Sequence, residues 1–267
     1  MSLLHVVRYR KDLVRNLVAR ELKGKYKGSA LGVLWSLLTP LFMAVIYIFF
    51  LRLLARGVPM SQIIIGVFAW QFSLNSLQDG MNAVTGNANL VKKVSFPRII
   101  LPLAVTLANL TNYLLSLLIQ FPLILMLLAF TSETGSVGWS VLAVPLMILY
   151  QTVFNVGLAM LMSSSNVYFR DTQHLVGVLM SAWFFLSPVM YNLDLVRGVT
   201  GSAPWVARVY MLNPMACFIE GYRSLILTNV SFPWNGWSIA GLLLPLLLAA
   251  VAYRIYQKAQ KNFADLL

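Results

Sequence analysis

The sequence predicts an all-α integral membrane protein with six transmembrane helices, and composition and charge spacing both support this. Of the 267 residues, 59% are hydrophobic and only 10% are charged, whereas soluble proteins are nearer ~45–50% apolar and ~25% charged. The mean hydropathy is +0.77. Charge-free windows recur along the chain, and each reaches the roughly 20 residues that a helix needs to cross a bilayer. Such continuous runs argue against a barrel, whose strands alternate over segments of about 10 residues.

The first element is an N-terminal amphipathic cytoplasmic helix over residues 1–30, predicted to lie at the membrane interface. At 100° per residue, an apolar half of the wheel includes Leu13, Val14 and Leu17, and Arg15 and Arg20 lie opposite. A basic helix of this kind lies in the headgroup plane beside a membrane. The alternative is a solvated basic tail.

A single transmembrane domain is predicted over residues 31–257, followed by a cytoplasmic tail over 258–267. The six spans are expected at about 32–52, 60–82, 100–130, 140–164, 173–192 and 234–256. Each lacks charges in its centre, where one Lys, Arg or Asp would cost ~2.5 to 3.5 kcal/mol. With the N-terminus inside, 15 of the 20 Lys and Arg residues lie on the cytoplasmic side, so both termini are predicted to be cytoplasmic.

The segment from Asp194 to Arg223 is different, because Arg197, Arg208 and Glu220 divide it into apolar pieces too short to cross. We expect external re-entrant or interfacial helices here, between spans 5 and 6, since neighbouring protein can satisfy the backbone groups that such irregular segments leave free. The alternative is an ordinary external loop.

The residues that carry chemistry elsewhere are scarce in this sequence. One cysteine and two histidines exclude a disulfide framework and a Cys- or His-rich metal centre. No G-x-x-x-x-G-K-[ST] phosphate loop is present. The sequence therefore predicts no catalytic residue, metal or cofactor in this chain. If the chain moves a substrate uphill, the energy must come from a partner. A membrane glycosyl- or acyltransferase is an alternative, for which only Asp79, Asp171 and His174 are available.

Five local motifs narrow the class. They are RELKGKYKGSALGVLWSLLTP (Arg20–Pro40), NANLVKKVSFPRIILPLA (Asn87–Ala104), YFRDTQ (Tyr168–Gln173), FFLSPVMY (Phe184–Tyr191) and LNPMACFIEGYR (Leu212–Arg223). In this order, and within six spans, they resemble the membrane subunit of ABC-type polysaccharide exporters, the family of O-antigen, capsule and teichoic acid permeases. The resemblance covers essentially the whole chain.

The resemblance implies an assembly in the bacterial inner membrane. Two copies of the permease pair, each docks a separate ABC ATPase subunit that holds ATP and Mg, and the complex exports a glycan carried on undecaprenyl diphosphate. Membrane lipids are further expected partners, whereas nucleic acid is not expected as a partner. The alternatives to this function are wall teichoic acid or capsule export by the same architecture, a related ABC permease for a smaller lipid or drug, and a non-transporting anchor.

The resemblance also places roles on residues. The ATPase-docking element corresponds to Asn89, Leu90, Lys92, Lys93, Phe96, Pro97 and Arg98. Its cations offer donors to carboxylates, although they could serve only as positive-inside anchors. The lipid diphosphate is expected at Arg20, Lys23, Lys25, Tyr26 and Lys27, which could equally bind bulk anionic lipid. Nearby, Gly28 and Gly32 could allow close helix packing or belong to a loop.

Aromatic rings are expected along the glycan conduit, because sugars present apolar C–H faces to amphipathic rings. The candidates lie on the first, second and fifth spans and are Trp35, Tyr47, Phe50, Trp70, Phe72, Trp183, Phe184, Phe185 and Tyr191. The alternative for each is a membrane-interface belt or core packing. The gate region is expected to include Pro188, Asn213, Pro214, Glu220 and Arg223.

Overall fold

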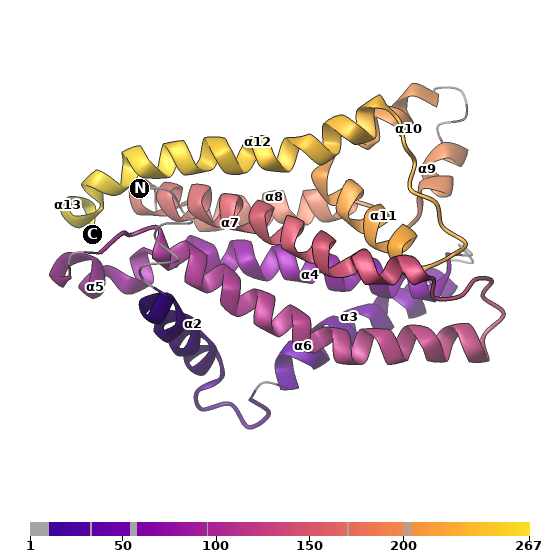
Figure 1. The fold of residues 1–267 in the computed structure, drawn as a ribbon, viewed down its shortest axis with the longest axis horizontal. Coiled ribbons are helices and arrows are strands. Elements are labelled where there is room, and N and C mark those ends of the chain that lie inside the picture. The colour runs from indigo at the N-terminus through magenta and orange to yellow at the C-terminus, as the bar shows by residue number, and fades with distance from the viewer. Residues whose placement is uncertain are drawn as a thin grey trace.

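The computed structural model describes residues 11–32, 34–53, 58–94, 96–169, 171–199, 201 and 204–267, and it is a bundle of long helices that run side by side (Figure 1). The first part of the predicted N-terminal helix, residues 1–10, lies outside the described residues. The helices are α2 (Lys11–Tyr26), α3 (Leu34–Leu53), α4 (Met60–Met81), η1 (Thr85–Asn87), α5 (Ala88–Lys93), α6 (Ile100–Phe130), η2 (Trp139–Ala143), α7 (Val144–Tyr168), α8 (Thr172–Phe185), α9 (Leu193–Val199), α10 (Pro204–Tyr210), α11 (Pro214–Ile226), α12 (Gly236–Ala259), η3 (Gln260–Asn262) and α13 (Phe263–Leu266).

The structure confirms a nearly all-helical chain with strongly apolar helices. Within the described ranges, β structure is limited to an isolated antiparallel bridge between Val137 and Leu227. Three helical stretches are long and apolar enough to cross a membrane: Ile100–Phe130, Trp139–Tyr168 and Gly236–Leu266. A shorter apolar helix covers Leu34–Phe50. The six-span count therefore remains a prediction for α3, α4 and α8.

Two ends of the bundle can be distinguished in Figure 1. We call the end that carries α5, α13 and the C-terminus the α5 end, and the opposite end, with α9, α10 and α11, the α11 end. The fifth predicted span, 173–192, corresponds to α8, which ends earlier, at Phe185. The chain then turns around Pro188, which has no backbone N–H to continue a helix.

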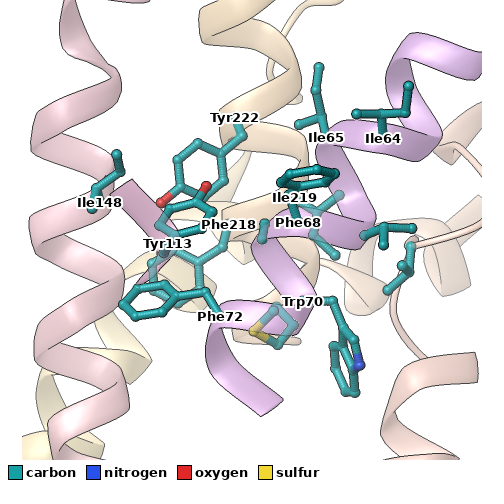
Figure 2. Packing of buried hydrophobic residues seen from close by; sticks show 14 of the residues in the cluster. Ile64, Ile65, Phe68, Trp70, Phe72, Tyr113, Ile148, Phe218, Ile219 and Tyr222 are labelled. Carbon is teal, nitrogen blue, oxygen red and sulfur yellow. The ribbon is translucent and has the colours of Figure 1, made fainter. Parts of the chain in front are cut away.

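The helix α4 lies at the centre of the bundle, in contact with α3, α6, α7 and α11. Its polar side chains Gln62, Ser73 and Ser76 are buried together with its apolar ones. Figure 2 shows Phe68 and Phe72 of α4 packed with residues of α6, α7 and α11. Because protein and not lipid surrounds α4, this helix tolerates more polar residues than the three apolar helices.

A hydrogen-bond network ties α4 to α7 and α11. Gln151 of α7 donates through Nε2 to the carbonyl oxygen of Ala69 and to Oγ of Ser73, each at 2.9 Å. The Ser73 hydroxyl donates to Oδ1 of Asn155 at 2.8 Å, and the Tyr222 hydroxyl donates to Oε1 of Gln151 at 2.8 Å. Buried polar groups need such partners because hydrocarbon offers none.

Small residues allow the helices to approach closely. A Cβ atom added at Gly157 of α7 would lie 2.8 Å from Cα of Ala249 on α12, and one added at Gly80 of α4 would lie 2.7 Å from Cβ of Ala159 on α7. These separations are below ordinary van der Waals contact. The α7–α12 and α4–α7 interfaces therefore follow the small-residue packing typical of membrane helices.

The close approach at Gly157 predicts that Gly157→Ala destabilises the protein by about 1–3 kcal/mol, because the backbone of α12 must move away. The matched control is Gly24→Ala in α2, where an added Cβ meets nothing within 4 Å. That change is expected to stabilise by about 0.4–1 kcal/mol. Thermal unfolding of the purified variants in detergent measures both, and equal shifts would contradict the packing described.

Candidate functional site: docking helix, headgroup hollow and buried gate

The predicted docking element lies at the α5 end, where η1 and α5 follow directly after α4 (Figure 1). Val91 is buried and fixes one side of α5 to the bundle. Asn89, Lys92 and Lys93 are exposed. The next residue, Val94, is 50% exposed. This short helix thus presents two cations and an apolar side chain to whatever lies beyond the α5 end.

The remaining docking candidates are anchored within the chain. Leu90 and Phe96 are half-buried against a hydrophobic cluster that includes Tyr256 and Phe263. Pro97 is half-buried beside them. Docking candidates other than Asn89, Lys92 and Lys93 therefore hold the element in place within this chain.

Arg98 connects the docking element to the C-terminal segment. Its guanidinium donates to the carbonyl oxygen of Gln260, and the Tyr256 hydroxyl donates to the carbonyl oxygen of Arg98 at 2.9 Å. Phe263 is fully buried, with its ring centroid 5.5 Å from that of Tyr256. Residues 260–266 are thus an anchored helical segment, and Arg98 has a bond inside the chain where a free donor was expected.

The helix α2 packs against α6 with its apolar side. Val14 and Leu17 are buried, whereas Arg15 and Arg20 are exposed. Arg20 donates to Oε1 of Glu21 at 3.1 Å and to Oδ1 of Asn87. The amphipathic pattern is therefore present over Lys11–Tyr26, and the alternative of a solvated tail is wrong for these residues. Its position relative to a membrane stays a prediction.

The predicted lipid-diphosphate residues gather around two hollows beside α2. Arg20, Lys23, Tyr26 and Lys27 line an outer hollow of 930 Å³, together with Asn16, Thr111 and Asn112. Lys23 and Lys27 are exposed there. Lys25 and Arg20 line a second hollow of 540 Å³.

Lys25 is not a free cation. Its Nζ donates to Oδ2 of Asp79 at 2.8 Å and to Oδ1 of Asn109 at 3.1 Å. Asn109 in turn donates through Nδ2 to Oδ2 of Asp79 at 2.9 Å. This three-residue cluster joins the end of α2 to α4 and α6. Sequence reasoning does not reveal this pairing, because its members are 30 to 84 positions apart.

Gly28 and Gly32 belong to the connection between α2 and α3. Their φ angles are +78° and +51°, which glycine adopts readily and other residues rarely do. The loop interpretation of this pair is therefore correct, and the helix-packing alternative is wrong.

The conduit candidates divide into exposed and buried rings. Trp35, Phe50 and Phe185 are 46%, 54% and 65% exposed. Trp70 and Phe72 of α4 are buried in the core, where Phe72 stacks on Tyr113 with centroids 4.8 Å apart (Figure 2). The packing alternative thus applies to these two rings.

The other four rings make local contacts. Tyr47 lies 5.4 Å from Phe184 between ring centroids, and Trp70 lies 5.9 Å from Trp183. These contacts join α3, α4 and α8. The Tyr191 hydroxyl is 2.9 Å from the Tyr210 hydroxyl, at the α11 end. These rings act as packing contacts between elements of this chain.

The segment between α8 and α12 forms three short helices at the α11 end. Within it, α11 is 13 residues long and buried against α4, α7 and α12. The external-loop alternative therefore does not describe Pro214–Ile226, while its depth in a membrane stays a prediction. Asn213 caps α11 and also accepts from Nε1 of Trp183 at 2.8 Å and donates to the carbonyl oxygen of Leu186 at 2.8 Å. The junction between α8 and α11 is thus fixed by side-chain bonds.

Arg223 is the most extensively bonded side chain of the gate region and is completely buried. It makes a 2.7 Å ion pair with Glu220. Its other donors reach the carbonyl oxygen of Gln62 at 3.0 and 3.1 Å, that of Tyr191 at 3.0 Å and that of Val189 at 3.5 Å. One guanidinium therefore joins α11, the start of α4 and the segment after Pro188. Pro188 is also buried.

The candidates for transferase chemistry do not form a shared site. The Asp79 carboxylate is bonded to Lys25 and Asn109, and Asp171 and His174 are exposed. Over the part of the chain that the structure describes, His, Cys, Asp and Glu form no group of three that could hold a metal. This geometry gives the transferase alternative no support.

Sequence reasoning missed a polar stripe on α6. Asn109, Asn112, Ser116 and Gln120 are all buried. Their spacing of three, four and four residues places them on one face of a helix, so the periodicity could have revealed them. This stripe faces the interior of the bundle and lines part of its hollows.

These features define a helical integral membrane protein with a polar central helix and a cationic helix at one end. Comparison with known proteins identifies the family. The chain belongs to the ABC-2 type transporter family, whose profile matches residues 12–227.

Two curated relatives are similar over nearly the whole chain. An O-antigen export system permease protein RfbA of Myxococcus xanthus is 31% identical over 258 residues, which cover 96% of this chain and 95% of the relative. A protein of the same name from Klebsiella pneumoniae is 30% identical over 259 residues, with the same coverage of both chains. The resemblance seen in the motifs is thereby confirmed.

The burial of Arg223 predicts that Arg223→Met destabilises the protein by about 3–5 kcal/mol, because Glu220 would be left buried and unpaired. The matched control is Arg208→Met on α10, where Arg208 is exposed and the change is expected to stay within about 0.5 kcal/mol. Adding Glu220→Gln to Arg223→Met should restore part of the loss. Thermal unfolding in detergent measures the stability of all three variants. An Arg223→Met protein as stable as the wild type would contradict a stabilising role for the Arg223 ion pair and hydrogen bonds.

Proposed function

We propose that this chain is the transmembrane permease subunit of an ATP-driven exporter. Its substrate is an undecaprenyl-diphosphate-linked polysaccharide of O-antigen type, moved from the cytoplasm to the outer face of the bacterial inner membrane. The observation that carries this proposal is the similarity, over 96% of the chain, to permeases named for O-antigen export. In this proposal the α5 end is cytoplasmic and the α11 end is external.

The partner of the α5 end is a separate ATPase subunit that binds ATP and Mg. The exposed Lys92 and Lys93 support this contact, because cations at an interface complement carboxylates and speed association. The adjacent Val94 offers an apolar contact. Closure of the ATPase would push on α5 and, through the cluster of Lys25, Asp79 and Asn109, on α2, α4 and α6.

A second copy of the chain completes the transporter. The α3 helix exposes Phe49 at 64%, and α8 exposes Val178 at 71%. Rings on the same two helices, Phe50 and Phe185, are exposed as well. We place the conduit between these helices of the two copies, with lipid as the alternative neighbour of the same faces.

The lipid diphosphate is proposed to bind at the outer hollow of 930 Å³. Lys23 and Lys27 are its exposed cations, suited to a doubly charged headgroup at the membrane interface. The short helices α9, α10 and α11 form the external gate. The Arg223 bonds hold α11 to the start of α4. In this proposal α9 and α10 would therefore move relative to α11.

Export by a reconstituted complex tests the proposed function. Vesicles would hold the purified permease with its partner ATPase and a labelled undecaprenyl-diphosphate-linked O-antigen. The proposal predicts ATP-dependent appearance of label on the far side. Transport of a teichoic acid precursor, a capsule precursor, a simple lipid or a drug instead would replace this substrate with one of the alternatives.

The docking assignment predicts that the double charge reversal Lys92→Glu and Lys93→Glu weakens ATPase association by about tenfold or more. The matched control is Lys258→Glu with Lys261→Glu, which reverses two other exposed cations at the same end. Co-purification and ATP turnover of the complex measure the effect. Equal association of both variants would assign Lys92 and Lys93 to membrane anchoring.

A further inference from the structure

An inner hollow of 130 Å³ lies within a single copy of the chain, between the end of α2 and the helices α3, α4 and α6. The lining residues that matter here are Lys25, Tyr26, Trp35, Asn75, Asn109 and Asn112. The inner hollow shares Tyr26 and Asn112 with the outer hollow of 930 Å³, which holds Lys23 and Lys27. The two hollows are therefore neighbours around the same side chains.

Two residues that line the inner hollow carry polar atoms without partners. Asn112 is 6% exposed, and its Oδ1 has no hydrogen-bond partner among the described residues; the hydroxyl of Tyr26 is in the same state. Buried polar atoms are seldom left unpaired, and each exception calls for an explanation such as an absent ligand or water. Two residues that line this hollow therefore each carry an unsatisfied polar atom that a polar ligand could engage.

The charges of the inner hollow select the kind of ligand. Lys25 is paired with Asp79 at 2.8 Å and with Asn109 at 3.1 Å, so its cation is already neutralised. The other polar lining groups named above are amides and a phenol, which donate and accept without net charge. This chemistry suits a neutral ligand rich in hydroxyl groups better than a phosphate.

Size and shape narrow the ligand further. An apolar cavity of about 150 Å³ accommodates one benzene molecule, so 130 Å³ admits at most one six-membered ring and not an oligosaccharide. Trp35 lines the hollow and is 46% exposed. Its indole face can cover the C–H face of a sugar ring, as aromatic residues do with amphipathic partners.

We propose that the inner hollow binds one sugar ring, the ring attached to the diphosphate of the lipid-linked substrate. This inference rests on the proposed function. With the diphosphate held by Lys23 and Lys27 in the outer hollow, the adjacent ring lies next to Tyr26 and Asn112, which line both hollows. The permease thereby distinguishes a lipid that carries a sugar from one that ends in diphosphate.

Binding of short-chain probes to the purified permease–ATPase complex in nanodiscs tests the proposal. The probes are farnesyl diphosphate and farnesyl diphosphate that carries one N-acetylglucosamine or one galactose. The variant is Asn112→Leu. The matched control is Gln120→Leu, because Gln120 is also a buried amide of α6 with an unpartnered oxygen but does not line the inner hollow.

The proposal predicts that Asn112→Leu weakens binding of a sugar-bearing probe about tenfold more than binding of farnesyl diphosphate, equivalent to about 1.4 kcal/mol, because Asn112 also lines the outer hollow. Gln120→Leu should change neither. Trp35→Leu, outside the core, should repeat the selective loss and serves if Asn112→Leu fails to fold.

Two results would overturn the inference and leave the proposed function standing. In the first, sugar-bearing probes bind the wild type, Asn112→Leu and Trp35→Leu equally, which means that water alone fills the hollow. In the second, Asn112→Leu and Trp35→Leu weaken the binding of all probes equally, which assigns the hollow to phosphate. Wild-type complex that binds no probe and shows no ATP-dependent export would overturn the proposed function itself.

Discussion

The structure depends on one constraint, which is that polar groups inside a bundle surrounded by apolar surfaces must find partners within the protein. The central helix α4 concentrates this demand. Its backbone and side chains bind Gln151 of α7 near the middle, the Arg223 guanidinium near its start and Lys25 near its end. The helices α2, α7 and α11 each contribute a bond that α4 could not make to lipid, so their placement around α4 follows from the partners that α4 requires.

The same bonds relate the two ends of the molecule. At the α11 end, Arg223 donates hydrogen bonds to the carbonyl oxygen of Gln62 and to that of Tyr191 in the segment that follows α8. At the other end of α4, the Asp79 carboxylate receives Lys25 from α2. One helix thus carries a gate contact and a contact to the amphipathic helix at its opposite ends. A partner that moves α2 or α5 would act on a helix that is already bonded to the gate region.

Much of the fold followed from the sequence, because charges mark helix ends in a membrane protein. The span predicted at 100–130 matches α6 (Ile100–Phe130), and the one at 60–82 nearly matches α4. The central position of α4 was not predictable, since it depends on tertiary packing. For the same reason the sequence places Lys25 at the lipid diphosphate or at bulk anionic lipid, and its pairing with Asp79 is seen only in the structure. The sequence analysis missed the burial of Asn112, although its spacing of three residues from Asn109 predicts that both lie on one face of a helix.

The central claim of the proposed function is that this chain provides a passage and a second subunit provides the energy. Transport by the purified chain alone, in vesicles with imposed proton and sodium gradients and a labelled lipid-linked glycan, tests it most directly. No net accumulation is expected until the ATPase and ATP are added. Sustained movement of the glycan against its concentration gradient, with this chain as the sole protein in the vesicle, would contradict it.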